Sequence, residues 1–196
     1  MSTRGRPRSF DRDAALLAAT RLFWARGYDG TSLSDLTKAM GISPSSFYAA
    51  FGDKRSLFAE AVQGYMQRYT AIYVEAAQSP TAREAAERIL RDSVDEFTDP
   101  DRPMTCLVVS AAIHGGSDTI DVRQTLEQHQ QGLAAILQER IEADRSTGAL
   151  PDASDPALLT DWVRTLWEGL SNQSNAGVPR ARLHEIITVA LRAWPS

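Results

Sequence analysis

The stretch from Thr31 to Lys54, TSLSDLTKAMGISPSSFYAAFGDK, constrains the fold more than any other part of the chain. Ser32 followed three residues later by Asp35 has the spacing of a helix N-terminal capping box. Gly41 can adopt the left-handed conformation that ends a helix, and the Ser-Pro pair after it can start another. The pattern predicts two short helices joined by a tight turn, the helix-turn-helix arrangement whose second helix can enter the DNA major groove.

The side chains of the second predicted helix suit contact with a duplex. Phe47 and Phe51 are four residues apart and can anchor its inner face. The groups left largely outward are small or carry hydroxyls, and they are Ser45, Ser46, Tyr48 and Ala49. Hydroxyls contact phosphates or base edges, and an alanine can meet a thymine methyl. Tight turns also join helices that touch no nucleic acid, so these residues alone leave both interpretations open.

Charge is distributed unevenly along the chain of 196 residues, whose formal net charge is −4. Residues 1–60 hold nine Lys and Arg against six Asp and Glu, a net of +3, so the remainder carries −7. A basic segment attached to an acidic body fits a DNA-contacting end. In residues 1–9, Arg4, Arg6 and Arg8 alternate with Gly5 and Pro7. They predict either a solvated tail or an arm that follows phosphates or enters the minor groove.

Hydrophobic periodicity predicts an all-α protein, and 43% hydrophobic residues are enough for a sizeable core. The expected helices are residues 11–26, the helix-turn-helix pair, a long helix beginning at residue 53, and helices over 81–97, 118–145, 155–177 and from 179 onward. Thr81 with Glu84 has the spacing of a second capping box, and the apolar residues of the long helix recur at four- and three-residue steps, namely Phe58, Val62, Tyr65, Tyr69 and Ile72. Residues 104–114 are apolar nearly all round. Their β-branched content would allow a strand, but no partner strand is evident, so a buried central helix is expected there.

The N-terminal third resembles the TetR family of bacterial transcriptional regulators over residues 5 to about 65. The motifs that carry the resemblance are G-Y-x-G-T-S, D-L-x-x-A-x-G-I-S, S-F-Y-x-x-F-G and D-K-x-x-L-F, in this order. The resemblance implies a homodimer with an N-terminal three-helix DNA-binding domain and a C-terminal helical domain for effector binding and dimerisation. We place these domains at residues 1–52 and 53–196. The implied partners are a double-stranded DNA operator and a small-molecule effector.

By motif position, the resemblance implies that Thr31, Ser32 and Ser34 meet phosphates or the groove edge, and that Lys54 holds a backbone phosphate. The residues expected to face the major groove are Ser43, Pro44, Ser45, Ser46, Tyr48 and Ala49. Few of them have the long polar side chains that make bidentate base contacts. We therefore expect phosphate positioning, Tyr48 packing and DNA shape to contribute more to the specificity than bidentate base contacts do.

Two further sets of residues are expected in the second domain. Aromatic, methionine and neighbouring side chains could line an effector cavity, although such residues at helical spacing are more often plain core. They are Met66, Tyr69, Tyr73, Phe97, Met104, Cys106, His114, Trp162 and Trp167. The last two helices carry more apolar surface than one-sided burial needs, which predicts a four-helix bundle between subunits. Its residues are Leu159, Val163, Leu166, Leu170, Leu183, Ile186, Ile187, Ala190 and Trp194.

Other chemistry is not indicated. The three histidines lack metal-ligand spacing, and no nucleophile, carboxylate-pair or phosphate-loop motif is present, so no metal, cofactor or enzyme activity is expected. The single cysteine, Cys106, predicts a buried structural thiol and a reducing, cytoplasmic compartment, and neither a signal peptide nor a membrane span is recognisable. The preferred interpretation is a DNA-binding repressor released by a small-molecule effector. The alternative is a helical small-molecule-binding or adaptor protein without DNA binding.

Overall fold

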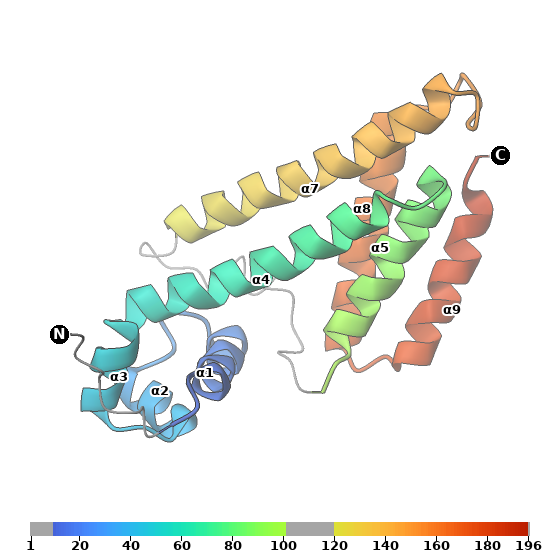
Figure 1. Ribbon diagram of the computed structural model, residues 1–196. Helices are drawn as coiled ribbons and strands as arrows, with labels where there is room; N and C mark the ends of the chain where they lie inside the picture. The colour runs from blue at the N-terminus through green and yellow to red at the C-terminus, as the bar shows by residue number, and fades with distance from the viewer. Residues whose placement is uncertain (1–9, 101–119, 196) are drawn as a thin grey trace.

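The computed structural model describes residues 10–100 and 120–195, and every regular element in these ranges is helical (Figure 1). The elements are α1 (Arg12–Arg26), α2 (Leu33–Met40), α3 (Pro44–Phe51), α4 (Lys54–Ala76), α5 (Ala82–Phe97), α7 (Ile120–Ser146), α8 (Pro156–Asn175), α9 (Arg180–Ala190) and the short 3-10 helix η2 (Leu191–Ala193). The predicted all-α class is confirmed. The basic residues of segment 1–9 and the helix expected over 104–114 lie outside the described residues.

Local capping explains where most of these helices begin. Both predicted capping boxes form, with side chain and backbone hydrogen bonds in both directions between Ser32 and Asp35 and between Thr81 and Glu84. Gly41 ends α2 in the left-handed conformation, with φ 65° and ψ 30°. The carboxylates and hydroxyls that accept backbone N–H groups at the other N-termini belong to Asp11, Ser43, Asp53 and Asp155.

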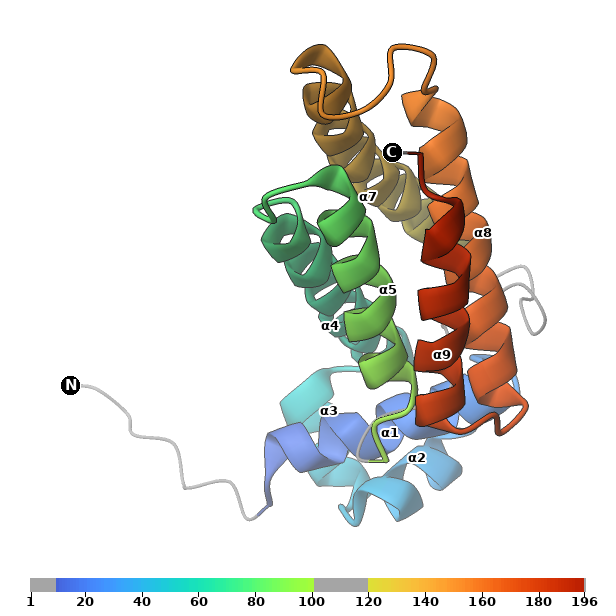
Figure 2. The ribbon, with the colours of Figure 1, turned by 90° about the vertical axis from the view of Figure 1, so that its right-hand side faces the viewer.

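Helix α4 connects the two ends of the molecule. Helices α1 to α3 form a unit at one end, and α4 runs from that unit into a body made by α5, α7, α8 and α9 (Figures 1 and 2). Near its start, Phe58 contacts the Phe23 ring of α1 with centroids 5.0 Å apart, and farther along Tyr69 contacts Trp167 of α8 at 5.6 Å. One hydrophobic core runs through both ends. The division at residue 52, just before this shared helix, stays a prediction.

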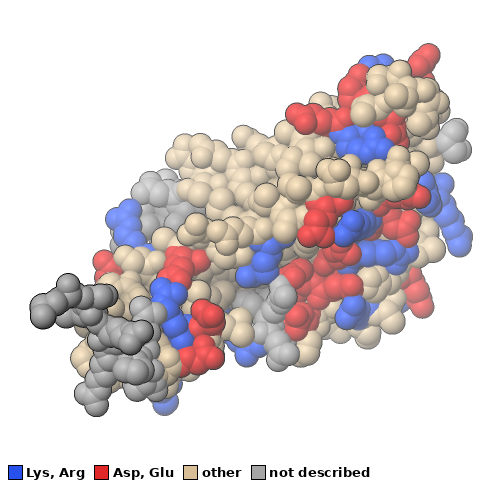
Figure 3. All heavy atoms as spheres, in the orientation of Figure 1, with Lys and Arg blue, Asp and Glu red and all other residues tan. Residues whose placement is uncertain are grey.

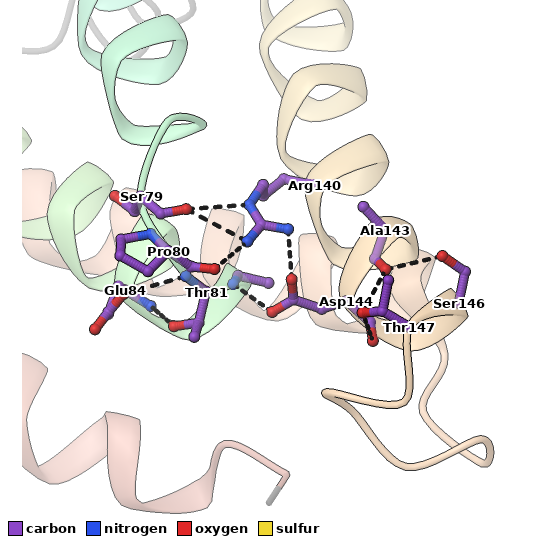
Figure 4. A network of polar contacts seen from close by, with 10 residues as sticks. Ser79, Pro80, Thr81, Glu84, Arg140, Ala143, Asp144, Ser146 and Thr147 are labelled. Atoms are coloured by element: carbon purple, nitrogen blue, oxygen red, sulfur yellow. Dashed lines mark hydrogen bonds and ion pairs between the residues drawn. The ribbon is translucent and has the colours of Figure 1, made fainter.

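The turn between α4 and α5 is tied to α7 by a buried polar network around Asp144, which we call the α4–α5 clasp (Figure 4). One Asp144 oxygen accepts the backbone N–H of Ala82 at 2.6 Å, at the first residue of α5, and the other pairs with Arg140. The Arg140 guanidinium also donates to the carbonyls of Ser79 and Pro80. Because a buried carboxylate needs such partners, the clasp fixes the far end of α4 against α7.

The structure differs from the predicted helices at two places. Tyr73, rather than Ile72, takes the buried position on the last full turn of α4, because a 3.6-residue period moves the inner stripe by one position over several turns. The last helix ends at Ala190 and passes through a 3-10 turn, so Trp194 is extended, with ψ 132°. Pro195 follows it, and a residue before proline favours this conformation over the helical one.

The surface of the body mixes both signs of charge. Figure 3 shows basic and acidic side chains interspersed around α5, where Arg88 bridges Glu75 of α4 and Asp92 of its own helix. Over the ranges 10–100 and 120–195, no helix has the length and apolar character needed to cross a membrane.

Candidate nucleic-acid interface

Serine hydroxyls fix the turn between α2 and α3. The Ser43 hydroxyl accepts the backbone N–H of Ser46 at 3.2 Å and lies 2.9 Å from the Ser45 hydroxyl and 3.0 Å from that of Ser46. Pro44 follows as the first residue of α3. Three hydroxyls therefore gather at the solvent-facing start of this helix, where unpaired backbone N–H groups and the helix dipole favour an anion such as a phosphate.

Helix α3 separates a buried aromatic face from an exposed one. The Phe47 and Phe51 rings are buried, as expected from their spacing, and they hold the helix on the core. Tyr48 is 54% exposed, and its ring stands edge-on to Phe47 with centroids 5.6 Å apart. Ser45 and Ala49 are also exposed, while Ser46 is half-buried. The exposed face thus offers one phenol and several small groups for close approach to a duplex.

Lys54 lies at the first residue of α4, close to the same surface. Its ammonium sits 4.1 Å from the centroid of the Tyr28 ring. A cation–π contact at a partly exposed site contributes only about 0.5–1 kcal/mol, so the ammonium can exchange it for a phosphate. The preceding residue, Asp53, caps α4 by accepting the Ser56 N–H at 2.7 Å. The ring holds Lys54 in place beside the N-terminus of this helix.

Two carboxylates at this end are held in the ionised form. Hydrogen bonds from the hydroxyl and then the backbone N–H of Ser32 lower the pKa of Asp35, and the backbone N–H of Ser56 lowers the pKa of Asp53. Asp35 also lies 3.4 Å from the Arg26 guanidinium. Both carboxylates accept hydrogen bonds at helix N-termini, and their negative charge offsets part of the positive charge of this region.

Not every residue carried over from the motif is placed to contact DNA. Thr31 is fully buried, and its hydroxyl donates to the carbonyl of Gly27 at 2.7 Å, so the predicted phosphate contact is wrong for this side chain. Ser32 is exposed, but its hydroxyl lies 2.5 Å from Asp35 in the capping box. Ser34 is exposed on the first turn of α2. Arg4 and Arg6 lie outside the described residues.

An ion pair that the sequence did not reveal lies beside the end of α3, the helix expected to enter the major groove, which we call the recognition helix. The Arg12 guanidinium donates to both carboxylate oxygens of Glu60, at 2.5 and 2.7 Å, and lies 4.6 Å from the Phe51 ring centroid. The contact joins α1 to α4 beside the last residue of α3. The two partners are 48 positions apart, and no local pattern relates them. Lys38, exposed on α2, was not among the predicted DNA contacts, although it is one of the surplus basic residues in this third of the chain.

The sequence and its relatives decide the family. The model for "Bacterial regulatory proteins, tetR family" matches residues 15–61. The HTH-type transcriptional repressor ComR of Escherichia coli (strain K12) is 32% identical over 197 residues, which cover 98% of this chain and 93% of ComR. The chain belongs to the TetR family. It is a helix-turn-helix transcriptional regulator and not an enzyme.

Solved structures agree with this assignment. The TetR family regulator CifR, determined as a cysteine mutant with 26-base-pair double-strand operator DNA, is 41% identical and superposes with a TM-score of 0.83, covering 97% of this chain and all of that one. NemR of E. coli in its reduced form has a TM-score of 0.71 over 92% of this chain and 94% of its own; at 23% identity it shows the fold alone.

Part of the predicted effector set comes together in the body of this TetR-family regulator. The Trp167 ring meets Phe97 at 5.3 Å and Tyr69 at 5.6 Å, joining α4, α5 and α8. Tyr73 is buried one turn farther along α4, and burial raises the pKa of its phenol above the usual range. Met66 is half-buried. Trp162 lies apart from this group, because its ring packs on Trp194 at 6.0 Å. Three members of the set fall outside the described residues, namely Met104, Cys106 and His114.

Most of the predicted dimer residues are core residues of a single chain. Those buried in one chain are Val163, Leu170, Leu183, Ile187 and Trp194; those half-buried are Leu159, Leu166 and Ala190. Ile186 is 37% exposed, and two residues outside the set, Leu158 and Val189, are 65% and 61% exposed. An apolar stripe identifies the inward face of a helix, so the apolar residues beside the stripe were overlooked.

In the part of the chain that the structure describes, no three His, Cys, Asp or Glu side chains could hold a metal ion.

Proposed function

We propose that this TetR-family regulator is a homodimeric repressor that binds a double-stranded DNA operator through α3 and is released when a small molecule binds its body. The observation that carries the proposal is the exposed face of α3, where Tyr48 and the serine hydroxyls stand over buried Phe47 and Phe51. ComR and NemR are named transcriptional repressors, and CifR was solved on operator DNA, which supports the same role here.

In the proposed complex, phosphates position the protein and a small face reads the groove. The hydroxyl cluster of Ser43, Ser45 and Ser46 and the ammonium of Lys54 meet phosphates, helped by Arg4 and Arg6 of the basic arm. Pro44, Tyr48 and Ala49 approach the base edges. Since this face has no long polar side chain, DNA shape contributes to the specificity.

We propose that the partner subunit covers the outer face of α8 and α9. The start of α8 and the end of α9 lie at the same end of the molecule (Figure 2), and they carry the exposed side chains of Leu158 and Val189. Ile186 continues this apolar surface along α9. Two helices from each chain would form a four-helix bundle. The buried residues of the predicted set would support this face from inside the chain.

Helix α4 is the proposed connection between effector and operator. Its first residue carries Lys54, its middle contacts the Trp167 ring through Tyr69, and its far end is held by the α4–α5 clasp. A ligand that favours a different position of α4 would change the separation of the two recognition helices. Such coupling is expected to be worth about 1–3 kcal/mol. Residues 1–52 and 53–196 are the proposed DNA-binding and effector domains.

Fluorescence anisotropy with DNA from upstream of the regulator's own gene tests the central claim. We expect sequence-preferring binding by submicromolar dimer that weakens steeply as salt rises from 50 to 200 mM, because phosphate contacts release counterions. Tyr48→Ala should weaken binding while leaving the fold intact. Equal affinity for operator and scrambled DNA would contradict the proposal and favour the adaptor interpretation.

Light scattering tests the dimer separately. We expect the wild-type chain to have the mass of a dimer, and Val189→Glu to produce monomer, because a charge on the covered face loses its hydration. Val74→Glu is the matched control, since Val74 is 47% exposed and belongs to α4 rather than to the two helices of the proposed interface. A Val189→Glu protein that stays dimeric would place the interface elsewhere.

A further inference from the structure

Among the residues that the structure describes, three buried polar groups at the seam between α5 and α8 lack a hydrogen-bond partner. They are the indole N–H of Trp167 and the hydroxyls of Ser93 and Ser171. Trp167 is 4% exposed, and both serines are fully buried. Buried polar groups in native proteins are almost always hydrogen-bonded, and leaving one unpaired costs stability. Three of them along one helix pair need a physical explanation.

The unpaired groups share one location. Ser93 precedes Phe97 by four residues on α5, and Ser171 follows Trp167 by four residues on α8, so each serine lies on the same helix face as its ring. The Phe97 and Trp167 rings are in edge contact at 5.3 Å. Tyr69 of α4 adds a third ring, 5.6 Å from Trp167. We call these five residues the seam cluster: rings and hydroxyls, without a charged side chain.

The chemistry of the seam cluster defines what it can bind. An indole N–H only donates, so its missing partner is an acceptor, whereas the two hydroxyls can donate or accept. Edge and face contacts with three aromatic rings suit a flat apolar body. A charged ligand would lose its hydration here, and none of the five described side chains of the cluster carries an opposite charge to replace it.

We propose that Trp167 selects the effector by donating its indole N–H to a carbonyl oxygen, and that the effector is a small neutral aromatic carbonyl compound. The inference rests on the proposed function only in taking the body as the effector domain. The unpaired N–H is the cost of keeping a donor ready in a buried site, and the bound carbonyl removes that cost. Ser93 and Ser171 supply secondary hydrogen bonds to the same ligand.

A pair of probes with similar size isolates the carbonyl. Acetophenone has a carbonyl group where ethylbenzene has a methylene, and the binding of each to the full-length protein is measured by calorimetry or ligand-observed NMR up to about 5 mM. We expect acetophenone to bind about tenfold more tightly, the gain of one hydrogen bond, equivalent to about 1.4 kcal/mol. Equal binding of the two probes, or no binding of acetophenone, overturns the proposal.

An isosteric change at Trp167 isolates the donor. Amber suppression replaces it with 3-benzothienylalanine, in which sulfur takes the place of the N–H. We expect the preference for acetophenone to fall below about twofold, while the melting temperature without ligand stays unchanged or rises because an unpaired buried donor has been removed. The same replacement at Trp162, which packs on Trp194, should keep the preference.

Two results would contradict the assignment of Trp167. One is a preference for acetophenone that survives the replacement, and the other is a lower melting temperature of the ligand-free variant, which would mean that the N–H already has a partner. Operator binding is measured on the same samples by anisotropy. Failure to bind the operator would contradict the proposed function. The preference for acetophenone over ethylbenzene tests the role of Trp167 independently of operator binding.

Discussion

The DNA-binding end and the body are both helical, but the polar contacts that shape α2 and α3 are local, whereas several of those that join the helices of the body span long distances along the chain. At the DNA-binding end, Ser32 pairs with Asp35 and Ser43 with Ser46, each three positions apart. In the body, Asp144 bonds to Ala82 across 62 positions. His184 likewise reaches Asp95 at 2.8 Å across 89 positions and Arg91 at 3.3 Å across 93.

This difference matches what each end has to do. The short-range caps of α2 and α3 form with the helices themselves, so the start of each of these helices is fixed by residues within the DNA-binding end. The long-range contacts of the body exist only when its helices are correctly placed, so a ligand that moves a helix changes several of them together. A ligand-controlled repressor needs a DNA-binding surface of fixed shape joined to a domain whose helices can change position when a ligand binds.

The largest expected effect comes from breaking the α4–α5 clasp. Asp144→Ala leaves Arg140 without its buried partner and the Ala82 N–H without its acceptor, and should lower the free energy of unfolding by about 3–5 kcal/mol in urea titration. Glu142→Ala is the control on the same helix, because Glu142 pairs with Arg145 at the surface and should matter little. Equal effects of the two variants would show that burial of the clasp does not decide its strength.

Truncating Tyr48 should separate DNA affinity from stability. Tyr48→Ala removes an exposed ring, so we expect operator binding to weaken by about 1–3 kcal/mol, with the free energy of unfolding changed by less than about 0.5 kcal/mol. Val74→Ala, a truncation at a similarly exposed apolar residue on α4, should change neither quantity. Loss of stability in Tyr48→Ala would mean that the exposed face of α3 also supports the fold.

Removing the N-cap of α3 should have a smaller effect on stability. Ser43→Ala deletes the acceptor for the Ser46 N–H and should cost about 1 kcal/mol, whereas Ser43→Gly should cost only a few tenths. Urea titration of the three proteins measures the difference. If alanine and glycine behave alike, the hydroxyl network at the start of α3 is not what holds this helix.

Acidification from pH 7.5 to 5.5 should have the smallest effect, and it should act on the body. Burial lowers the pKa of His129, whose ring lies 2.9 Å from the Thr70 hydroxyl between α4 and α7. As pH falls through about 6.5 the unfolded chain takes up this proton before the folded chain does, so stability decreases. His129→Gln should flatten the dependence in urea titrations at both pH values.

The DNA-binding end should not respond over that range of pH. The pKa values of Asp35 and Asp53 are lowered, so their contribution to stability persists until the pH falls through the low values at which the folded carboxylates take up protons. Hydrogen exchange of α2 and α3 at pH 7.5 and 5.5, corrected for the intrinsic rate, measures this. Loss of protection in these helices at pH 5.5 would remove the contrast between the two ends.

The sequence predicted the features that depend on neighbours in the chain. The capping boxes at Ser32 and Thr81, the end of α2 at Gly41 and the burial of Phe47 and Phe51 are all set within a few residues, and all are confirmed. Thr31 shows the limit of motif position: its hydroxyl was assigned to DNA, yet it bonds to a carbonyl four residues back inside the core.

The remaining features required contacts between distant segments. Nothing near Arg12 in sequence indicates Glu60, nothing near Asp144 indicates Ala82, and the stripe that contains Val163 and Leu183 could not reveal whether a partner chain or the chain's own helices cover it. By itself the sequence determined the helices, their caps and the family, because these depend on local hydrogen bonds and periodicity. Only the tertiary structure decided which polar groups find partners and which, like the Trp167 N–H, do not, because helix packing brings the possible partners together.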